Sequence, residues 1–420
     1  MKSYCKPKKC NIESVKFNTP AVFNAFTSKL KRGDFQEVLI QLGGIKPIDL
    51  YSDILNGSMV HIIPAIDNIT SILTKRIKNR DLELKPIRQF DRVDGISRKL
   101  RHLCHESVEQ QIFEYIAVHA LMPLFKTRIL PCQFASVPGR GQTPGKRKLE
   151  RLLRRKFHCK IESGKCDIHH AYPSTTIELV MKLLKKDIHK NKTLLWFIEA
   201  LSSNYPNSTL IIGGYLSTWL FNYIMSFLIQ YLFSLYSVRR GKRKKMVLAV
   251  VCYADDFVIF GRRSLILKAL KKADRWVKEN LNLSIKSQWE LTSYWNFNEE
   301  KVNKASRDRG RKWRCPRIDM MGYVVRRTYT IIRRKVYVRV RKHFIRGLKE
   351  LETLGYIPWY RARKIIAYWG FVVNTNSMKF REKYQAKKVY KASTKSISYI
   401  SKIDRMEDIK KYERKLFKVA

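Results

Sequence analysis

The amino-acid sequence predicts an α+β fold. Strand-like runs rich in β-branched and aromatic residues alternate with helical patterns of unequal length, and the regular βαβ rhythm of a doubly wound sheet is absent. The 420 residues, 45% of them hydrophobic, are enough for a large core divided into two or three subdomains. Strands are expected at 158–168, 247–260 and 318–339, and helices at 107–122, 174–189, 216–237, 263–280, 342–353 and in basic stretches from 359 onward.

The chain is strongly basic. Lys and Arg number 85 against 35 Asp and Glu, which gives a formal net charge of +50. Basic runs occur at 146–156, 239–245 and 307–317 and throughout the C-terminal quarter. An excess of this size repels itself unless a polyanion neutralises it, and the interleaved Trp and Tyr residues favour a nucleic-acid cleft. A basic protein of the membrane surface is the alternative.

The cysteine pattern indicates a reducing compartment. The eight cysteines form no C-x-x-C pair, and the opening residues lack the apolar segment of a secretory signal, so reduced thiols in a cytoplasm are expected. Cysteine and histidine residues also gather between 158 and 170, although their spacing matches no common zinc module: His158, Cys159, Cys166, His169 and His170.

Residues 209–237 carry no charge and are long enough to cross a bilayer. Small and polar residues interrupt this stretch, among them Gly213, Ser217 and Asn222. A helix buried inside a large domain explains this composition better, and no membrane is expected as a partner.

Three aspartates form the main candidate site. Asp255 and Asp256 interrupt two apolar, strand-like runs in "VCYADDFVIFG" at 251–261, and Asp167 closes an earlier strand-like run. Facing each other across a sheet, these carboxylates would suit Mg²⁺, and two ions about 3.5–4 Å apart would stabilise an attacking 3′-hydroxyl and a leaving pyrophosphate. The plain alternatives are a hairpin turn for the doublet and a helix N-cap for Asp167.

Four segments resemble reverse transcriptases, in the order found in that family. "YADD" resembles their motif C, "DIHHAY" at 167–172 resembles motif A, and "LNLSIKSQWEL" at 281–291 resembles motif D. "IGGYLSTWLFN" at 212–222 resembles motif B, although Ile212 and Thr218 replace the usual Gln and Pro. The family implies a right-hand polymerase fold, with fingers, a palm containing an antiparallel sheet, and a helical thumb.

The resemblance implies a role for each matching residue of the metal site. Asp167, Asp255 and Asp256 would bind Mg²⁺, or Mn²⁺ as a substitute, with the backbone carbonyl of Ile168 assisting and Asp255 the more direct ligand of the doublet. Lys286 would be a general acid for the pyrophosphate, unless it is simply a solvated surface lysine.

Further residues would contact the nucleic acid or the nucleotide. Tyr172 would exclude a 2′-hydroxyl and so select deoxynucleotides, with ordinary core packing as the alternative. "RIDMMGYVVRR" at 317–327 resembles the primer-grip hairpin, and "DGISRKLRHL", which also reads as a basic hairpin, resembles a fingers motif. The residues implied in these contacts are Lys99, Arg101, Gly213, Ser217 and Asn222 for the nucleotide, and Gly322 and Tyr323 for the primer.

The family resemblance also implies boundaries for the parts of the chain. They are a largely helical N-terminal extension at 1–90, fingers at 91–165 with part of 185–210, a palm with motifs A to E at 166–338, and a helical thumb with a basic C-terminal region at 339–420.

The motif set as a whole resembles the defence-associated ("unknown group") bacterial reverse transcriptases, which are related to those of diversity-generating retroelements. It implies a cytoplasmic RNA-directed DNA polymerase that copies a structured non-coding RNA into cDNA from dNTPs, in antiviral defence. The alternatives are a diversity-generating, group II intron or retron enzyme. An RNA-binding scaffold with an idle polymerase fold is the alternative without catalysis.

Overall fold

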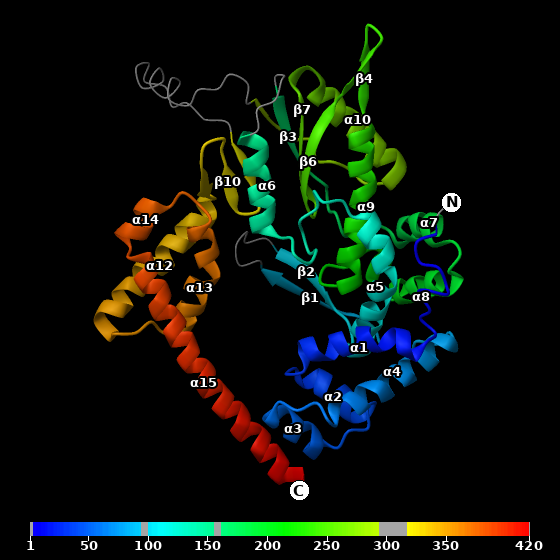
Figure 1. The fold of residues 1–420 in the computed structure, drawn as a ribbon, viewed down its shortest axis with the longest axis vertical. Coiled ribbons are helices and arrows are strands. Elements are labelled where there is room, and N and C mark those ends of the chain that lie inside the picture. Colours follow the sequence, from blue (N-terminus) through cyan, green and yellow to red (C-terminus); the bar gives the residue numbers. More distant parts are fainter. Residues whose placement is uncertain (1–2, 94–99, 155–160, 294–316, 420) are drawn as a thin grey trace.

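The computed structural model describes residues 3–93, 100–154, 161–293 and 317–419 (Figure 1). It confirms an α+β fold in which helices predominate. In the described ranges every pairing between two named strands is antiparallel. The strands form a four-stranded sheet, a three-stranded sheet and two separate hairpins.

The N-terminal region is helical, as expected for 1–90. Its helices are α1 (Val15–Lys29), α2 (Gly33–Gln41), α3 (Pro47–Asn56) and α4 (Ile62–Lys78). In α4 the buried residues recur every three or four positions, at Ile62, Ile66, Ile69, Leu73 and Ile77. This spacing places them on one face of the helix, which packs against α1.

The four-stranded sheet lies at the centre of the fold, with strand order β6-β7-β3-β8. Its strands are β3 (Ile161–Asp167), β6 (Val247–Tyr253), β7 (Asp256–Arg262) and β8 (Glu290–Ser293). Successive side chains of a strand point to opposite faces. In β7, Phe257 and Ile259 pack on one side, whereas Val258 and Phe260 pack on the other. Both faces are therefore covered, which explains why these strands read as continuous apolar runs.

Helices cover one face of this sheet, and α6 with the three-stranded sheet covers the other. The helices of this part of the chain are α5 (Val108–Arg128), α6 (Gln142–Arg154), α7 (Ile177–Ile188), α8 (Lys192–Ser203), the short 3₁₀ helix η1 (Pro206–Ser208), α9 (Tyr215–Ser234) and α10 (Arg263–Leu281). Within the described residues, α9 is the one helix long and apolar enough to cross a bilayer. Of its most apolar 18-residue stretch, 72% is buried inside the protein. This burial agrees with the predicted interior helix.

Two hairpins project from the body of the protein. The first pairs β1 (Arg88–Val93) with β2 (Leu100–His105) and confirms the predicted basic hairpin, although its turn lies outside the described residues. The second pairs β4 (Tyr236–Arg239) with β5 (Lys242–Lys245). Its turn residues Arg240 and Gly241 both have positive φ, at 51° and 69°, as a tight two-residue hairpin turn requires.

The C-terminal part begins with β9 (Ile318–Met320), β10 (Tyr323–Val325) and β11 (Thr330–Ile332) and continues as α12 (Arg334–Leu354), α13 (Trp359–Val373), α14 (Met378–Lys383) and α15 (Ala386–Val419). The strand predicted up to residue 339 is wrong beyond 332, because α12 starts at Arg334. Alternating Val and basic residues suggested a strand there. The buried residues Val336, Val340 and Phe344 instead follow a spacing of four, which only a helix places on one face.

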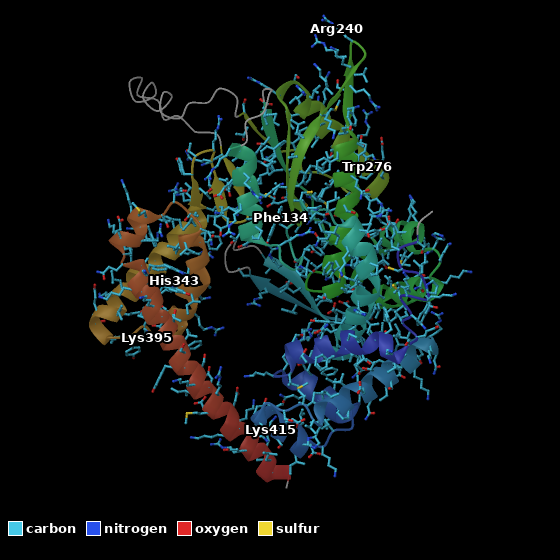
Figure 2. All side chains as sticks on the ribbon, in the orientation of Figure 1. Phe134, Arg240, Trp276, His343, Lys395 and Lys415 are labelled. Atoms are coloured by element: carbon cyan, nitrogen blue, oxygen red, sulfur yellow. The ribbon has the colours of Figure 1, made fainter. Side chains whose placement is uncertain are left out.

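The long helix α15 returns to the N-terminal helices, so the chain closes on itself (Figure 1). Near its end, the Tyr412 hydroxyl accepts a hydrogen bond of 2.9 Å from Gln36 Nε2 in α2. The Lys415 ammonium lies 4.4 Å from the ring centre of Tyr51 in α3, at the junction labelled in Figure 2.

Candidate active site

The three aspartates predicted from the sequence meet at one end of the central sheet. Asp167 is the last residue of β3, Asp256 is the first residue of β7, and the two are direct cross-strand partners. Asp255 stands in the turn between β6 and β7, where its carbonyl accepts a 3.2 Å hydrogen bond from the Ile168 amide. Cross-strand partners share a face, so Asp167 and Asp256 both point toward the side covered by α6 and the three-stranded sheet.

The turn that carries Asp255 is strained. Tyr253 pairs with Asp256, which leaves Ala254 and Asp255 as the two turn residues. Ala254 has a φ of 54°, a left-handed conformation that costs a residue with a Cβ roughly 1–2 kcal/mol. The paired strands on both sides hold this conformation, and strain of this kind gathers at functional sites.

The doublet is a concentration of partly buried negative charge. Burial, together with the charges of Asp167 and Asp256, raises the pKa of Asp255 to about 6. Burial also raises the pKa of Asp256, although the nearby Lys165 ammonium opposes the shift. Carboxylates that disfavour their own charge in this way are stabilised by a cation placed between them.

Lys286 lies at the same site, as motif D predicted. Its ammonium forms an ion pair with Asp167, and its amide donates a 2.9 Å hydrogen bond to the Asp167 carbonyl. The hydrogen bond to Asp167 raises the pKa of Lys286, so the side chain is protonated at neutral pH. With 42% of its side chain exposed, Lys286 is accessible to a ligand from the solvent.

The donor atoms suit a hard cation, although they are not preset around one. The Oδ1 atom of Asp167 is buried and has no hydrogen-bond partner in the described part of the chain. A pocket of about 350 Å³ opens beside it, lined by Asp167, Asp256, Lys286, Lys165 and His169 among others. Within the described ranges, no three His, Cys, Asp or Glu side chains already converge on a metal position. A bound cation would therefore have to compete with Lys286 for Asp167.

Tyr172 packs beside the aspartate turn. Its ring is stacked on Phe221 of α9, with ring centres 5.0 Å apart and planes 25° from parallel. Burial is the main cause of the raised pKa of Tyr172, and the charge of Asp255 adds to it, whereas a hydrogen bond with Thr218 opposes the shift. The ring thus packs against the core at Phe221 and lies near enough to Asp255 to sense its charge.

Gly213 holds the first hairpin against the start of α9. Its φ is 116°, and a Cβ at this position would lie 2.9 Å from the carbonyl oxygen of Cys104 in β2. The Cys104 amide also donates a 3.1 Å hydrogen bond to the Ile212 carbonyl. The segment resembling motif B is therefore attached to the hairpin that contains Arg101.

Ser217 and Asn222 lie inside the protein, not on a surface open to a nucleotide. The Ser217 hydroxyl accepts a hydrogen bond of 3.3 Å from the Ile211 amide, and Asn222 Nδ2 donates one of 3.1 Å to the Ala135 carbonyl. Any effect of these two side chains on a nucleotide must pass through the segments that they hold.

The two hairpins implied in substrate contacts differ in exposure. Arg101 is exposed and pairs with Arg92 across β1 and β2, so two like charges stand opposite each other, whereas Lys99 lies outside the described residues. Gly322 is in the β9–β10 turn, as predicted, with a φ of 81°. Tyr323 is buried, so a primer contact at this hairpin would involve its backbone.

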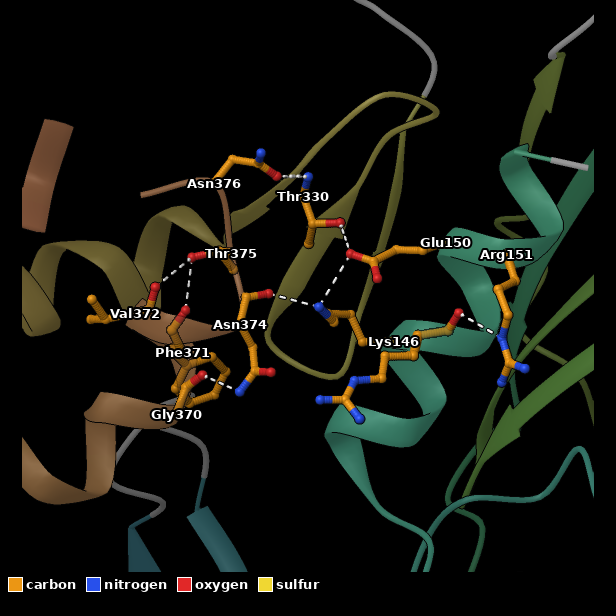
Figure 3. Close-up of polar contacts among 11 residues, drawn as sticks. Lys146, Glu150, Arg151, Thr330, Gly370, Phe371, Val372, Asn374, Thr375 and Asn376 are labelled. Atoms are coloured by element: carbon orange, nitrogen blue, oxygen red, sulfur yellow. Dashed lines mark hydrogen bonds and ion pairs between the residues drawn. The ribbon is translucent and has the colours of Figure 1, made fainter. Parts of the chain in front are cut away.

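A polar joint connects α6, the three-stranded sheet and the end of α13 (Figure 3). The Lys146 ammonium lies 3.2 Å from Glu150 and donates a 2.7 Å hydrogen bond to the Asn374 carbonyl. The Thr330 hydroxyl donates a 2.5 Å hydrogen bond to Glu150. The Lys146 ammonium also lies 5.8 Å from the ring centre of Tyr323. The joint therefore holds the predicted primer-grip hairpin against α6.

The sequence analysis missed two features near the site. Lys165 stands two residues before Asp167, on the same face of β3, and the period of two could have identified it. Glu106 and Glu114 form a buried carboxyl pair under the start of α9, where Glu114 accepts a 2.9 Å hydrogen bond from the Leu216 amide. Burial, with Glu114 adjacent, raises the pKa of Glu106 to about 9, so this pair retains a proton at neutral pH.

The cysteine and histidine residues between 158 and 170, whose spacing matches no common zinc module, do not form a metal-binding group in the described part of the chain. His158 and Cys159 lie outside it, Cys166 is buried, and His169 and His170 are exposed.

No protein-family model matches the sequence, and no curated protein matches it. A solved structure of telomerase from Candida albicans, in complex with a fragment of telomeric RNA, is similar at 12% identity with a TM-score of 0.38. That match covers 79% of this chain and 64% of the telomerase chain, so the chemistry of the site has to be read from its own residues.

Proposed function

We propose that the protein is an RNA-directed DNA polymerase. The observation that carries this proposal is the meeting of Asp167, Asp255 and Asp256 at one sheet edge, with Lys286 and Tyr172 beside them. These five residues come from segments far apart in the sequence. The resemblance to motifs A, C and D assigns these same residues to the metal site and the nucleotide.

The three carboxylates would hold Mg²⁺, with Mn²⁺ as a substitute, and the Ile168 carbonyl lies in the same segment. Such ions, when bound, favour ionisation of a primer 3′-hydroxyl and neutralise the charge of a leaving pyrophosphate. The protonated Lys286 would leave Asp167 and donate its proton to the pyrophosphate oxygen. Its side chain already lies at the edge of the pocket where this transfer would occur.

Deoxynucleotides are the proposed substrates, because Tyr172 combines a fixed ring with proximity to Asp255. The stack on Phe221 restricts the orientation of the Tyr172 ring. A ring held in this position would collide with a ribose 2′-hydroxyl.

RNA is the proposed template. The net charge of +50 favours a polyanionic partner, and Arg92 and Arg101 are cross-strand partners on the exposed first hairpin. The finer part of the proposal is a bacterial, cytoplasmic enzyme that copies a structured non-coding RNA in antiviral defence. It rests on the motif resemblance alone, and sequencing the RNA that co-purifies with the protein tests it. A cell-average RNA mixture would contradict a dedicated template.

The test of polymerase activity is primer extension on an RNA template with dNTPs and Mg²⁺. Asp255→Asn keeps the size of the side chain but removes its charge, and we expect extension to fall at least about a hundred-fold, since several kcal/mol of stabilisation are lost. Asp404→Asn, an exposed aspartate of α15, is the matched control and should leave extension unchanged. Extension at the parent rate in Asp255→Asn would overturn the proposal.

A further inference from the structure

An open hollow of about 680 Å³ lies between the α12–α13 turn and α15. Aromatic side chains dominate its wall: Tyr356, Trp359 and Tyr360 from the turn and the start of α13, and Tyr399 from α15. Lys395 of α15 lines it as well. None of these residues belongs to a segment that the motif analysis assigned to catalysis.

The aromatic rings are unusually exposed for their size. Tyr356, Trp359, Tyr360 and Tyr399 are 58%, 49%, 53% and 65% exposed. Scattered apolar side chains on a surface need no explanation, but four large rings gathered around one hollow indicate a binding site. A flat ring offers a stacking surface to any nucleobase, whatever its identity.

The charge around these rings selects the kind of ligand. Lys395 and Tyr399 also line a second hollow of about 530 Å³ along α15, together with Lys391 and Lys402. Among the described residues, no Asp or Glu lines either hollow. The Arg363 guanidinium lies 5.4 Å from the ring centre of Trp359, which adds positive charge at the edge of the first hollow. Aromatic faces interleaved with ammonium groups match a single-stranded nucleic acid, whose bases stack while its phosphates bind cations.

The hollow is remote from the aspartates. In Figure 1 the turn between α12 and α13 lies at the lower left, whereas β3 and β7 lie in the upper middle of the molecule. Figure 2 shows Lys395 on the outer side of α15, directed away from the centre of the molecule. A strand bound here would not be the stretch being copied.

We propose that the α12–α13 turn and α15 bind an unpaired segment of RNA outside the polymerase centre. Its bases stack on Trp359 and Tyr399, and Lys395 contacts a phosphate between them. The choice of RNA over DNA rests on the proposed function, because an enzyme that copies RNA needs a hold on its template away from the copied stretch. The binding itself does not depend on catalysis.

The test measures binding of the full-length protein to a fluorescent, unstructured 12-nucleotide RNA by anisotropy. We expect Trp359→Ala and Tyr399→Ala each to weaken binding about ten-fold, as loss of one base-stacking ring does. Trp359→Phe keeps a stacking ring and should restore most of the affinity. Lys395→Ala should reduce the slope of log K against log salt by about 0.7, the amount expected for one phosphate contact on a single strand.

Controls separate this site from others on the protein. Phe23→Ala removes an aromatic ring that is 37% exposed from α1 and should leave RNA affinity unchanged. Binding to a fully paired RNA duplex should be the same for Trp359→Ala as for the parent. If Trp359→Ala and Tyr399→Ala both bind single-stranded RNA as tightly as the parent, the proposal is overturned. The hollow would then be a site for a protein partner.

The catalytic variant distinguishes failure of this proposal from failure of the proposed function. Asp255→Asn should bind the 12-nucleotide RNA as the parent does, whether or not the protein is a polymerase. If the parent extends no primer but the ring variants still weaken RNA binding, the RNA site stands and the polymerase assignment fails.

Discussion

At the scale of single residues, Asp255 is the side chain most affected by its surroundings. The pKa of its carboxyl rises from 3.8 to about 6 because it is mostly buried beside two other carboxylates. A folded-state pKa above the unfolded value means that the folded protein binds the proton more tightly. Ionised Asp255 therefore destabilises the fold, and this cost increases as the pH rises from about 4 to about 6.

Asp255→Asn should consequently stabilise the metal-free protein at neutral pH. A shift of about two pKa units corresponds to about 3 kcal/mol in the free energy of unfolding, which is an upper bound for the gain at pH 7.5. Urea unfolding in EDTA at pH 7.5 and at pH 4.5 measures it, and the gain should be much smaller at the lower pH. Addition of Mg²⁺ should raise the stability of the parent more than that of the variant. Equal stability of the two proteins at pH 7.5 would contradict the electrostatic account.

Tyr172 has two roles that a substitution can separate. If the ring excludes a 2′-hydroxyl, Tyr172→Val should raise ribonucleotide use relative to deoxynucleotide use by ten-fold or more, since about 1.4 kcal/mol corresponds to ten-fold. The measurement is the ratio of kcat/KM for a matched dNTP and rNTP. Tyr172→Phe keeps the ring and should keep the ratio.

The stack of Tyr172 on Phe221 also contributes to the core. Tyr172→Val should therefore lower the free energy of unfolding, by up to about 2–4 kcal/mol if the surroundings do not relax. A lower melting temperature with an unchanged dNTP to rNTP ratio would leave Tyr172 as a packing residue.

At the scale of elements, the joint between α6 and the three-stranded sheet is a mostly buried ion pair within α6, between Lys146 and Glu150. Hydrogen bonds connect this pair to Asn374 and Thr330, which are far from it in the sequence. The side chains of Lys146 and Glu150 are only 6% and 17% exposed. Removing one partner leaves the other charge uncompensated, which typically costs 3–5 kcal/mol. The joint thus holds the hairpin of Gly322 and Tyr323 in place relative to α6.

Lys146→Ala should lower the free energy of unfolding by about 3 kcal/mol or more. Arg147→Ala, the exposed neighbour on the same helix, should change it by less than about 0.5 kcal/mol. Urea denaturation of both variants against the parent provides the comparison. Similar losses in the two variants would show that the joint adds nothing specific.

Element boundaries show where local pattern decides the structure and where it does not. Helix α9 and the strands β6 and β7 were predicted because their apolar runs have lengths typical of a helix or a strand and are bounded by turn residues. The start of α12 was missed because its alternating Val and basic residues fit a strand as well as a helix. Only the packing of Val336, Val340 and Phe344 in the core around α13 distinguishes the two. The β4–β5 hairpin was missed because a basic run carries no hydrophobic period.

At the scale of the whole molecule, contacts of α15 with α2 and α3 close the chain into a circuit. The contacts at its end include the hydrogen bond between Tyr412 and Gln36, the Tyr412 ring 5.5 Å from that of Tyr51, and the Lys415 ammonium near both rings. A closure made by the end of one helix can open without unfolding the rest of the protein.

A Tyr412→Ala, Lys415→Ala double variant should release the C-terminal half of α15. Hydrogen exchange of backbone amides in 400–416 should become faster by ten-fold or more, because most of the described residues between 400 and 411 are exposed and pack on little else. The melting transition of the central sheet should not move. Lys418→Ala, an exposed basic residue of the same helix, is the control and should leave exchange unchanged.

The sequence by itself determined the α+β class, the three carboxylates, the basic partner surface and the interior position of α9. These features follow from side-chain chemistry and from the period of apolar residues, both of which are local. The tertiary structure alone decided that Lys286 meets Asp167, 119 residues away, and that Tyr412 meets Gln36, 376 residues away. It also showed that Ser217, Asn222 and Tyr323 are buried and that four aromatic rings surround one hollow. Such facts depend on which distant segments pack together, and the free energy of that packing is a property of the whole core, which no single stretch of sequence contains.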